Sequence, residues 1–295
     1  MPHPTRRGLL QGAAVVAGAG MLPVGRGIAA PIGLPQSAPV SVAAVGLLAR
    51  DAPGLAAWYE RFVGLQRLSA DKNGVWLGAA DVPLLEIIAA PGLEPAPAGA
   101  AGLFHTAFLL PARADLARWV IAAAQARFPV DGASDHLVSE AIYLTDPEGN
   151  GVEIYVDRPA GTWTWKAGQV EMATLPLDIE GLVADVRDGD ALWRGAPAGT
   201  AIGHVHLKVG DAAKAGAWWQ ETLSFEPVRT RRGAVFLSTG GYHHHIAVNE
   251  WQSAGAGVRP PGQAGLAYVE LKSRSAAQPS RHVDLWGTQI RIRPA

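Results

Sequence analysis

One glutamate in a strand-like segment and a set of histidines are the residues of this sequence best suited to chemistry. Glu153 lies among alternating apolar residues typical of a β-strand, where a buried carboxylate is unfavourable unless it is paired or bound to a metal. His105, His204, His206 and the run His243–His245 also lie in or beside apolar, strand-like segments. Because the chain contains no cysteine, any metal would be held by nitrogen and oxygen ligands. This pattern favours a metal site over the alternative, a half-exposed glutamate on an open sheet face.

The overall composition is that of a globular chain, with 48% hydrophobic and 17% charged residues among 295 positions. A formal net charge of −1 argues against a nucleic-acid partner, which would need a basic face. No apolar run in the expected mature chain reaches the length of a membrane span. The absence of cysteine excludes disulfides and is compatible with an oxidising compartment.

Residues 1–30 are predicted to be an export signal. Arg6 and Arg7 precede a run of small and apolar residues from Gly8 to Val24, and small residues at 27–30 offer a cleavage site. This arrangement is similar to a twin-arginine (Tat) signal, which implies a periplasmic or extracellular protein. The alternative is a basic tail without a fixed structure.

The elements that would position the candidate residues form a repeat. A strand followed by an amphipathic helix is predicted three times, with strands at about 42–48, 103–110 and 202–209 and helices ending near 62, 127 and 223. Short strands and turn residues follow each helix, at about 139–144 and 152–156 in the second unit and 226–230, 234–238 and 243–248 in the third. A shortened fourth unit covers about 265–292. One unit leaves a sheet face bare, so it must pair with another, and a pair forms a cupped sheet around a cavity.

These features resemble the vicinal-oxygen-chelate superfamily, which includes glyoxalases, fosfomycin- and bleomycin-resistance proteins and extradiol ring-cleaving dioxygenases. The resemblance is carried by the four modules, by Gly-His-Val-His-Leu at 203–207 and by Tyr-Leu-Thr-Asp-Pro-Glu-Gly-Asn-Gly-Val-Glu-Ile-Tyr at 143–155. Within the superfamily, the stretch from Phe-Leu-Ser to Tyr-His-His-His-Ile-Ala at 236–247 is similar to catechol 2,3-dioxygenases. The Asp-Pro-x-Gly-Asn-x-x-Glu turn is more specific for the superfamily than for the reaction.

The predicted fold class is therefore α+β, with four βαβββ modules paired into curved, cup-like mixed sheets and helices outside. We expect a first domain at 40–159, which holds modules one and two, and a linker at 160–200. A second domain is expected at 201–295, with module three and the shortened module four.

The resemblance implies that a metal is held from the first strand of two paired modules and from the last strand of one or both. The first-strand positions read Ala44, His105, His204 and Tyr268, and the last-strand positions read Glu86, Glu153, 243–245 and about Arg291. Only a pairing of modules two and three brings His105, His204 and Glu153 together, a ligand set typical of non-haem Fe(II) oxygenases. We therefore predict this pairing, although the best-known extradiol enzymes pair modules sequentially. His206 remains an alternative to His204, and Glu86 is expected to form a salt bridge or hydrogen bond.

Three further site residues follow from the resemblance. His244 matches the acid–base histidine that handles dioxygen, Tyr143 the active-site tyrosine, and His136 a histidine that hydrogen-bonds the substrate. The predicted function is thus an extradiol dioxygenase that cleaves a small catechol-type aromatic with O2. Its expected cofactor is Fe(II), with Mn(II) or another divalent metal as alternatives, and a homo-oligomer is compatible with the resemblance.

Two other functions remain open at this point. The first is another metal-dependent reaction of the same fold, such as a glyoxalase-like isomerisation or a resistance-type transfer. The second is a non-catalytic protein that binds an aromatic compound or a metal.

Overall fold

The computed structural model of the chain describes residues 35–184, 186, 190 and 192–295. The export signal predicted for residues 1–30 lies outside these residues. Module one consists of β1 (Val40–Ala49), α1 (Ala52–Phe62), β2 (Gln66–Asp71), β3 (Gly74–Ala79) and β4 (Val82–Ala89). Module two consists of β5 (Gly102–Leu109), α2 (Arg113–Ala126), β6 (Gly132–Asp135), β7 (Ser139–Thr145) and β8 (Gly151–Asp157).

Module three consists of β11 (Ala201–Lys208), α4 (Ala212–Leu223), β12 (Glu226–Arg231), β13 (Ala234–Ser238) and β14 (Ile246–Asn249). Module four consists of β15 (Gly265–Ser273), β16 (Ser280–Val283) and β17 (Gln289–Pro294). Outside the modules lie η1 (Pro35–Ser37), η2 (Ala160–Thr162), β9 (Trp165–Lys166), β10 (Gln169–Val170) and α3 (Ile179–Val183). Module four has no helix between its first two strands. No helix in the described part of the chain is long and apolar enough to cross a membrane.

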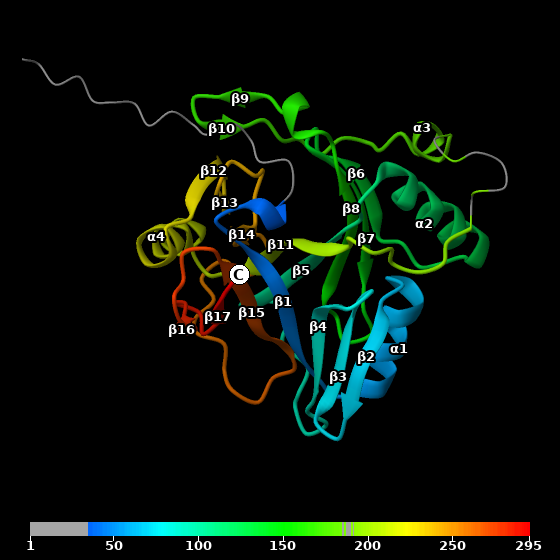
Figure 1. Ribbon diagram of the computed structural model, residues 1–295. Helices are drawn as coiled ribbons and strands as arrows, with labels where there is room; N and C mark the ends of the chain where they lie inside the picture. The colour runs from blue at the N-terminus through cyan, green and yellow to red at the C-terminus, as the bar shows by residue number, and fades with distance from the viewer. Residues whose placement is uncertain (1–34, 185, 187–189, 191) are drawn as a thin grey trace, which may run out of the picture.

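The described strands form two large mixed sheets, which run side by side through the molecule with the helices outside (Figure 1). One sheet has the order β16-β17-β15-β1-β4-β3-β2, and the other β12-β13-β14-β11-β5-β8-β7-β6. Strand β1 pairs antiparallel with β15, and β5 pairs antiparallel with β11. The predicted fold class and the pairing of module two with module three are confirmed. We call these the 1–4 sheet and the 2–3 sheet.

Each large sheet takes one module from either side of the segment 160–200. The domain boundaries expected at 159/160 and 200/201 stay a prediction. Strand pairing joins module two to module three and module one to module four across these boundaries.

The two sheets share one hydrophobic core. Val45 and Leu47 on β1 and Val205 and Leu207 on β11 are fully buried in it. Side chains alternate between the faces of a strand, so the residues between them face the other way, into the cup of each sheet. His204 and His206 on β11 are such residues, which places the predicted site on the cup side of the 2–3 sheet.

Most predicted element boundaries agree with the structure to within two residues, but the strand predicted at 243–248 begins only at Ile246. Gly240 and Gly241 adopt positive φ angles of 67° and 76°, and the chain turns there. The Nδ1 atoms of His243 and His244 lie 2.8 Å apart. Adjacent side chains of a regular strand point to opposite faces and could not make this contact.

Candidate metal centre

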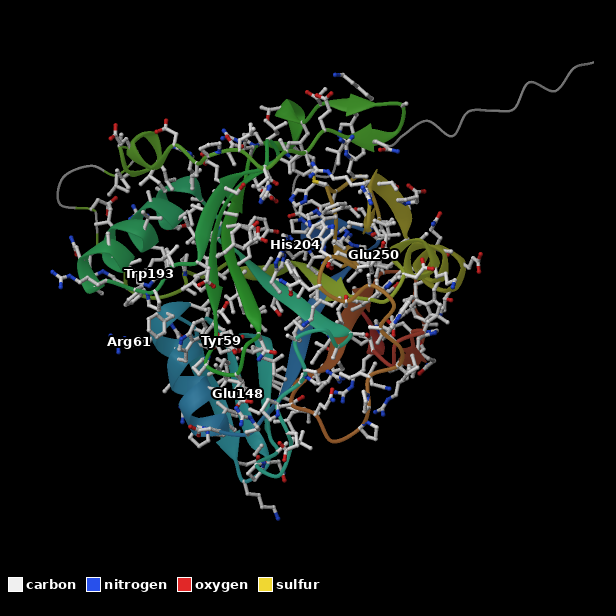
Figure 2. The ribbon with its side chains drawn as sticks, turned by 180° about the vertical axis from the view of Figure 1, so that it is seen from behind. Tyr59, Arg61, Glu148, Trp193, His204 and Glu250 are labelled. Carbon is white, nitrogen blue, oxygen red and sulfur yellow. The ribbon has the colours of Figure 1, made fainter. Side chains whose placement is uncertain are left out.

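The strand registers bring Glu153 and two histidines together around a small residue. Ala107 in the centre of β5 is paired with Glu153 of β8 on one side and with His204 of β11 on the other. His105 lies two positions before Ala107 and therefore on the same face of β5. The alanine side chain leaves the space between its larger neighbours open. Figure 2 shows His204 in the middle of the molecule, between the strands of module two and those of module three.

Three side-chain atoms form a compact triangle at this point. His105 Nε2 lies 3.0 Å from Glu153 Oε2, His204 Nε2 lies 3.2 Å from the same oxygen, and the two nitrogens are 3.3 Å apart. Donors that each stand about 2.1 Å from one ion, at right angles, are separated by about 3.0 Å. The triangle therefore fits a single shared cation, and the donor types suit a divalent transition metal.

Burial makes this interpretation stronger. Glu153 and His204 are each 2% exposed and His105 is 6% exposed. Burial raises the pKa of Glu153, but the charge and hydrogen bonds of His204 and His105 outweigh it and hold that pKa well below its ordinary range. Burial lowers the pKa of His204 to about 4. At neutral pH the site thus holds an ionised carboxylate and a neutral imidazole, which are the protonation states that metal binding requires.

The alternative ligand, His206, lies beside this triangle and not in it. Its ring centroid is 5.0 Å from that of His105, and its Nε2 is buried without a hydrogen-bond partner among the described residues. The geometry thus favours His204, with His105 and Glu153, as the group that could hold a metal.

A cavity of about 320 Å³ opens onto the triangle. All six residues predicted for the site line it: His105, His136, Tyr143, Glu153, His204 and His244. Its walls are mainly apolar and include Phe104, Phe236 and Trp251. A cavity of this size and lining suits one small aromatic molecule. Of these three, Trp251 was one of four tryptophans in predicted linkers that could line an aromatic pocket, whereas Phe104 and Phe236 were not singled out from the sequence.

On one side of the cavity, His136 and Tyr143 form a hydrogen-bonded pair. His136 Nδ1 donates to the carbonyl of Ala173 at 2.6 Å, so in the neutral ring Nε2 accepts from the hydroxyl of Tyr143 at 2.6 Å. Burial, and then the charge of Glu153, raises the pKa of Tyr143 well above its usual value. Tyr143 is therefore a protonated phenol whose single O–H donates to His136.

On another side, His244 is held by a chain of hydrogen-bonded polar groups. Asp157 Oδ1 accepts from His243 Nε2 at 2.8 Å, so neutral His243 accepts through Nδ1 from Nδ1–H of His244. Asp157 Oδ2 also accepts from the hydroxyl of Tyr242 at 2.8 Å. This assignment leaves Nε2 of His244 as its unprotonated ring nitrogen.

Asp157 was not predicted from the sequence. A signal for it exists, because Glu153, Tyr155 and Asp157 alternate along β8 and share one face. Its partner His243 lies 86 residues away, so no local pattern could have linked the two.

Comparisons with known proteins agree with this geometry. Residues 41–154 match the model of the Glyoxalase/Bleomycin resistance protein/Dioxygenase superfamily. The catechol-2,3-dioxygenase of Bacillus subtilis (strain 168) is 42% identical over 173 residues, which cover 58% of this chain and 60% of that protein. The match thus spans less than two thirds of the relative's length.

Solved structures show the same fold at low identity. Glyoxalase I from Zea mays superimposes with a TM-score of 0.52 at 11% identity, covering 86% of this chain and 92% of that one. The cppA protein from Streptococcus pneumoniae TIGR4 superimposes with a TM-score of 0.54 at 10% identity, covering 86% and 100%. The sequence of residues 41–154 thus matches this superfamily, and the described chain shares the fold of these solved structures.

Proposed function

We propose that the protein is a metal-dependent extradiol dioxygenase that cleaves a catechol-type ring beside its hydroxyl groups with O2. The observation that carries the proposal is the buried triangle of His105, His204 and Glu153 at the wall of an apolar cavity. The similarity to a catechol-2,3-dioxygenase supports the choice of reaction.

The residues of the triangle would hold the metal, and two histidines with one carboxylate form the ligand set of non-haem Fe(II) oxygenases. Bound there, Fe(II) would supply Lewis acidity toward vicinal hydroxyls and redox chemistry toward dioxygen. The protein's own part is to keep the donors in their metal-binding protonation states and to exclude water from the cavity.

His244 is proposed as the base that accepts a proton from a catechol hydroxyl. It lines the cavity, and its ring centroid lies 4.1 Å from that of His204, so it borders the metal centre. Burial lowers the pKa of His244 well below its usual value, which keeps Nε2 unprotonated at neutral pH. The negative charge of Asp157, acting through His243, would stabilise the imidazolium that forms when His244 takes up the proton.

Tyr143 and His136 are proposed to orient the substrate. Tyr143 is paired with Glu153 across β7 and β8, so its side chain stands beside the metal centre. Its raised pKa keeps the phenol protonated, and its single O–H would turn from His136 Nε2 to a deprotonated substrate oxygen when the substrate binds. Phe104, Phe236 and Trp251 would contact the ring faces and edges.

The experiment is anaerobic loading of the purified chain with Fe(II), addition of a panel of substituted catechols, and admission of O2. We expect a yellow ring-fission product and consumption of about one O2 per catechol. His105→Ala should abolish the product, and Glu86→Gln, in the other sheet, should not. Loaded protein that gives no ring-fission product with any member of the panel would contradict the proposal.

A further inference from the structure

A second cavity, of about 490 Å³, lies in the 1–4 sheet and shares no lining residue with the cavity at the metal centre. It is lined by Gln36, Ala38, Ser41, Lys272, Arg274, Arg293 and Ala295. Three of these residues form one row across adjacent strands: Ser41 of β1 is paired with Lys272 of β15, which is paired with Arg293 of β17. Residues paired in this way project from the same face and have neighbouring side chains.

Three cationic side chains, Lys272, Arg274 and Arg293, lie at this cavity, and only Arg293 has a carboxylate partner among the described residues. Arg293 Nε donates to Glu270 Oε1 at 2.9 Å. Lys272 and Arg274 have no ion-pair partner among the described residues. Counted with Arg293, Glu270 and the terminal carboxylate of Ala295 at the same cavity, positive charge remains in excess. Like charges on adjacent strands destabilise a sheet unless an anion lies between them. Burial, and then the charges of Arg293 and Arg274, lowers the pKa of Lys272.

Neutral donors at the same cavity are also without partners. Ser41 is only 1% exposed, and its Oγ has no hydrogen-bond partner among the described residues. The same holds for the buried Nε2 of Gln36. A buried hydroxyl or amide without a partner is unfavourable, and a bound polar species at this cavity would satisfy both groups.

These donors come from segments that are far apart in the sequence but meet at one end of β1. The backbone N–H of Arg274 donates to the carbonyl of Pro39 at 2.9 Å, which joins the end of β15 to the residue before β1. Figure 1 shows η1 and the C-terminal end of the chain at this same end of β1. A ligand here would therefore contact η1, β1, β15 and β17 at once.

We propose that this cavity binds a small oxyanion of the phosphate class. Lys272 and Arg274, which have no other ion-pair partner among the described residues, would form charge-assisted hydrogen bonds with its oxygens. Ser41 Oγ and Gln36 Nε2 would donate hydrogen bonds to its remaining oxygens. Arg293 would complete the cavity wall while it stays paired with Glu270.

The test is calorimetric titration of the full chain with inorganic phosphate, repeated with sulfate, at an ionic strength held constant with sodium chloride. We expect saturable binding of about one anion per chain. Lys272→Met should weaken it at least tenfold and Ser41→Ala severalfold. The control Lys214→Met, which removes an exposed lysine of α4, should bind as the wild type does. Equal affinity in Lys272→Met and wild type, or no saturable heat in the wild type, would overturn the proposal.

Two further measurements distinguish anion binding in this cavity from binding at the metal centre and from a structural role of Lys272. Phosphate could also bind a metal at the other cavity, so binding should survive in His105→Ala, and its loss there would contradict the proposal. In chloride alone, Lys272→Met should raise the thermal midpoint because it removes like-charge repulsion, but phosphate should no longer raise it further. A lower midpoint in chloride would show that Lys272 has a structural role instead, and would contradict an anion site.

Discussion

The two large sheets of this molecule, each curved into a cup, have the same strand pairing but different side chains at corresponding positions. In the 2–3 sheet, Ala107 is paired with both Glu153 and His204. In the 1–4 sheet, Gly46 is paired with both Glu86 and Tyr268. The registers therefore make Glu86 the counterpart of Glu153 and Tyr268 the counterpart of His204. Ala44, two positions before Gly46, is the counterpart of His105.

The side chains at these positions decide what each cup can do. The hydroxyl of Tyr268 donates to Glu86 Oε2 at 2.5 Å, which confirms the hydrogen bond expected for Glu86. The guanidinium of Arg291 lies 3.5 Å from the ring centroid of Tyr268. A carboxylate is thus retained in both cups, but only the cup with two histidines presents three metal donors. In the other, an aromatic ring fills the space.

The largest expected difference between the cups is in metal binding. Glu153→Gln removes the only charged donor of the triangle and should weaken binding of Fe(II) or Mn(II) at least a hundredfold, because the buried site loses its negative charge. Glu86→Gln should leave the affinity unchanged. Titration of both variants with the metal under anaerobic conditions measures this. Equal loss in both variants would contradict the assignment of the metal to the 2–3 sheet.

The next effect concerns Asp157, which lies four positions after Glu153. The residue four positions after Glu86 in the 1–4 sheet is Ala90, which carries no charge. Asp157→Asn keeps a hydrogen-bond acceptor for His243 but removes the negative charge. We expect kcat to fall about tenfold to a hundredfold, since general acid–base steps contribute about 10²–10⁴, with little change in KM. Asp81→Asn, at an exposed turn, is the control. Steady-state kinetics that show a higher KM and an unchanged kcat would exclude a positioning role.

A smaller effect is expected when Gly46, at the centre of the 1–4 sheet, is replaced by alanine, which is the residue at the corresponding position 107 of the 2–3 sheet. Gly46→Ala places a Cβ only 2.2 Å from Cε1 of the Tyr268 ring, so the ring must move. We expect a loss of about 1–3 kcal/mol in the free energy of unfolding, measured by urea denaturation. The same substitution in a Tyr268→Ala background should cost much less. An equal cost in both backgrounds would show that the ring is not what requires glycine.

The smallest effect concerns pH. Gln289 is the register counterpart of His245, whose pKa is lowered by burial to about 3. An unfolded histidine titrates near about 6.5, so the unfolded chain takes up the proton first and stability falls as pH drops from 6.5 toward 3. His245→Gln should reduce this slope by up to about 1.4 kcal/mol per pH unit. Urea denaturation at pH 7, 6 and 5 tests this, and an unchanged slope would contradict it.

Much of the fold could be predicted because alternation, helical periodicity and turn residues are local signals. The pairing of modules followed from a chemical argument, since only one pairing brings His105, His204 and Glu153 together. What could not be predicted depends on contacts between distant segments. The bond between His243 and Asp157, the loop geometry that accompanies it, and the place of Phe104 and Phe236 in the cavity wall all belong to this class.

The central claim is that one metal ion is shared by His105, His204 and Glu153. Crystals of the chain loaded with Fe(II) under anaerobic conditions, measured on both sides of the iron absorption edge, test it most directly. We predict one anomalous peak per chain, within about 2.0–2.2 Å of His105 Nε2, His204 Nε2 and a carboxylate oxygen of Glu153. A peak at any other place, with none between these three residues, would contradict the account.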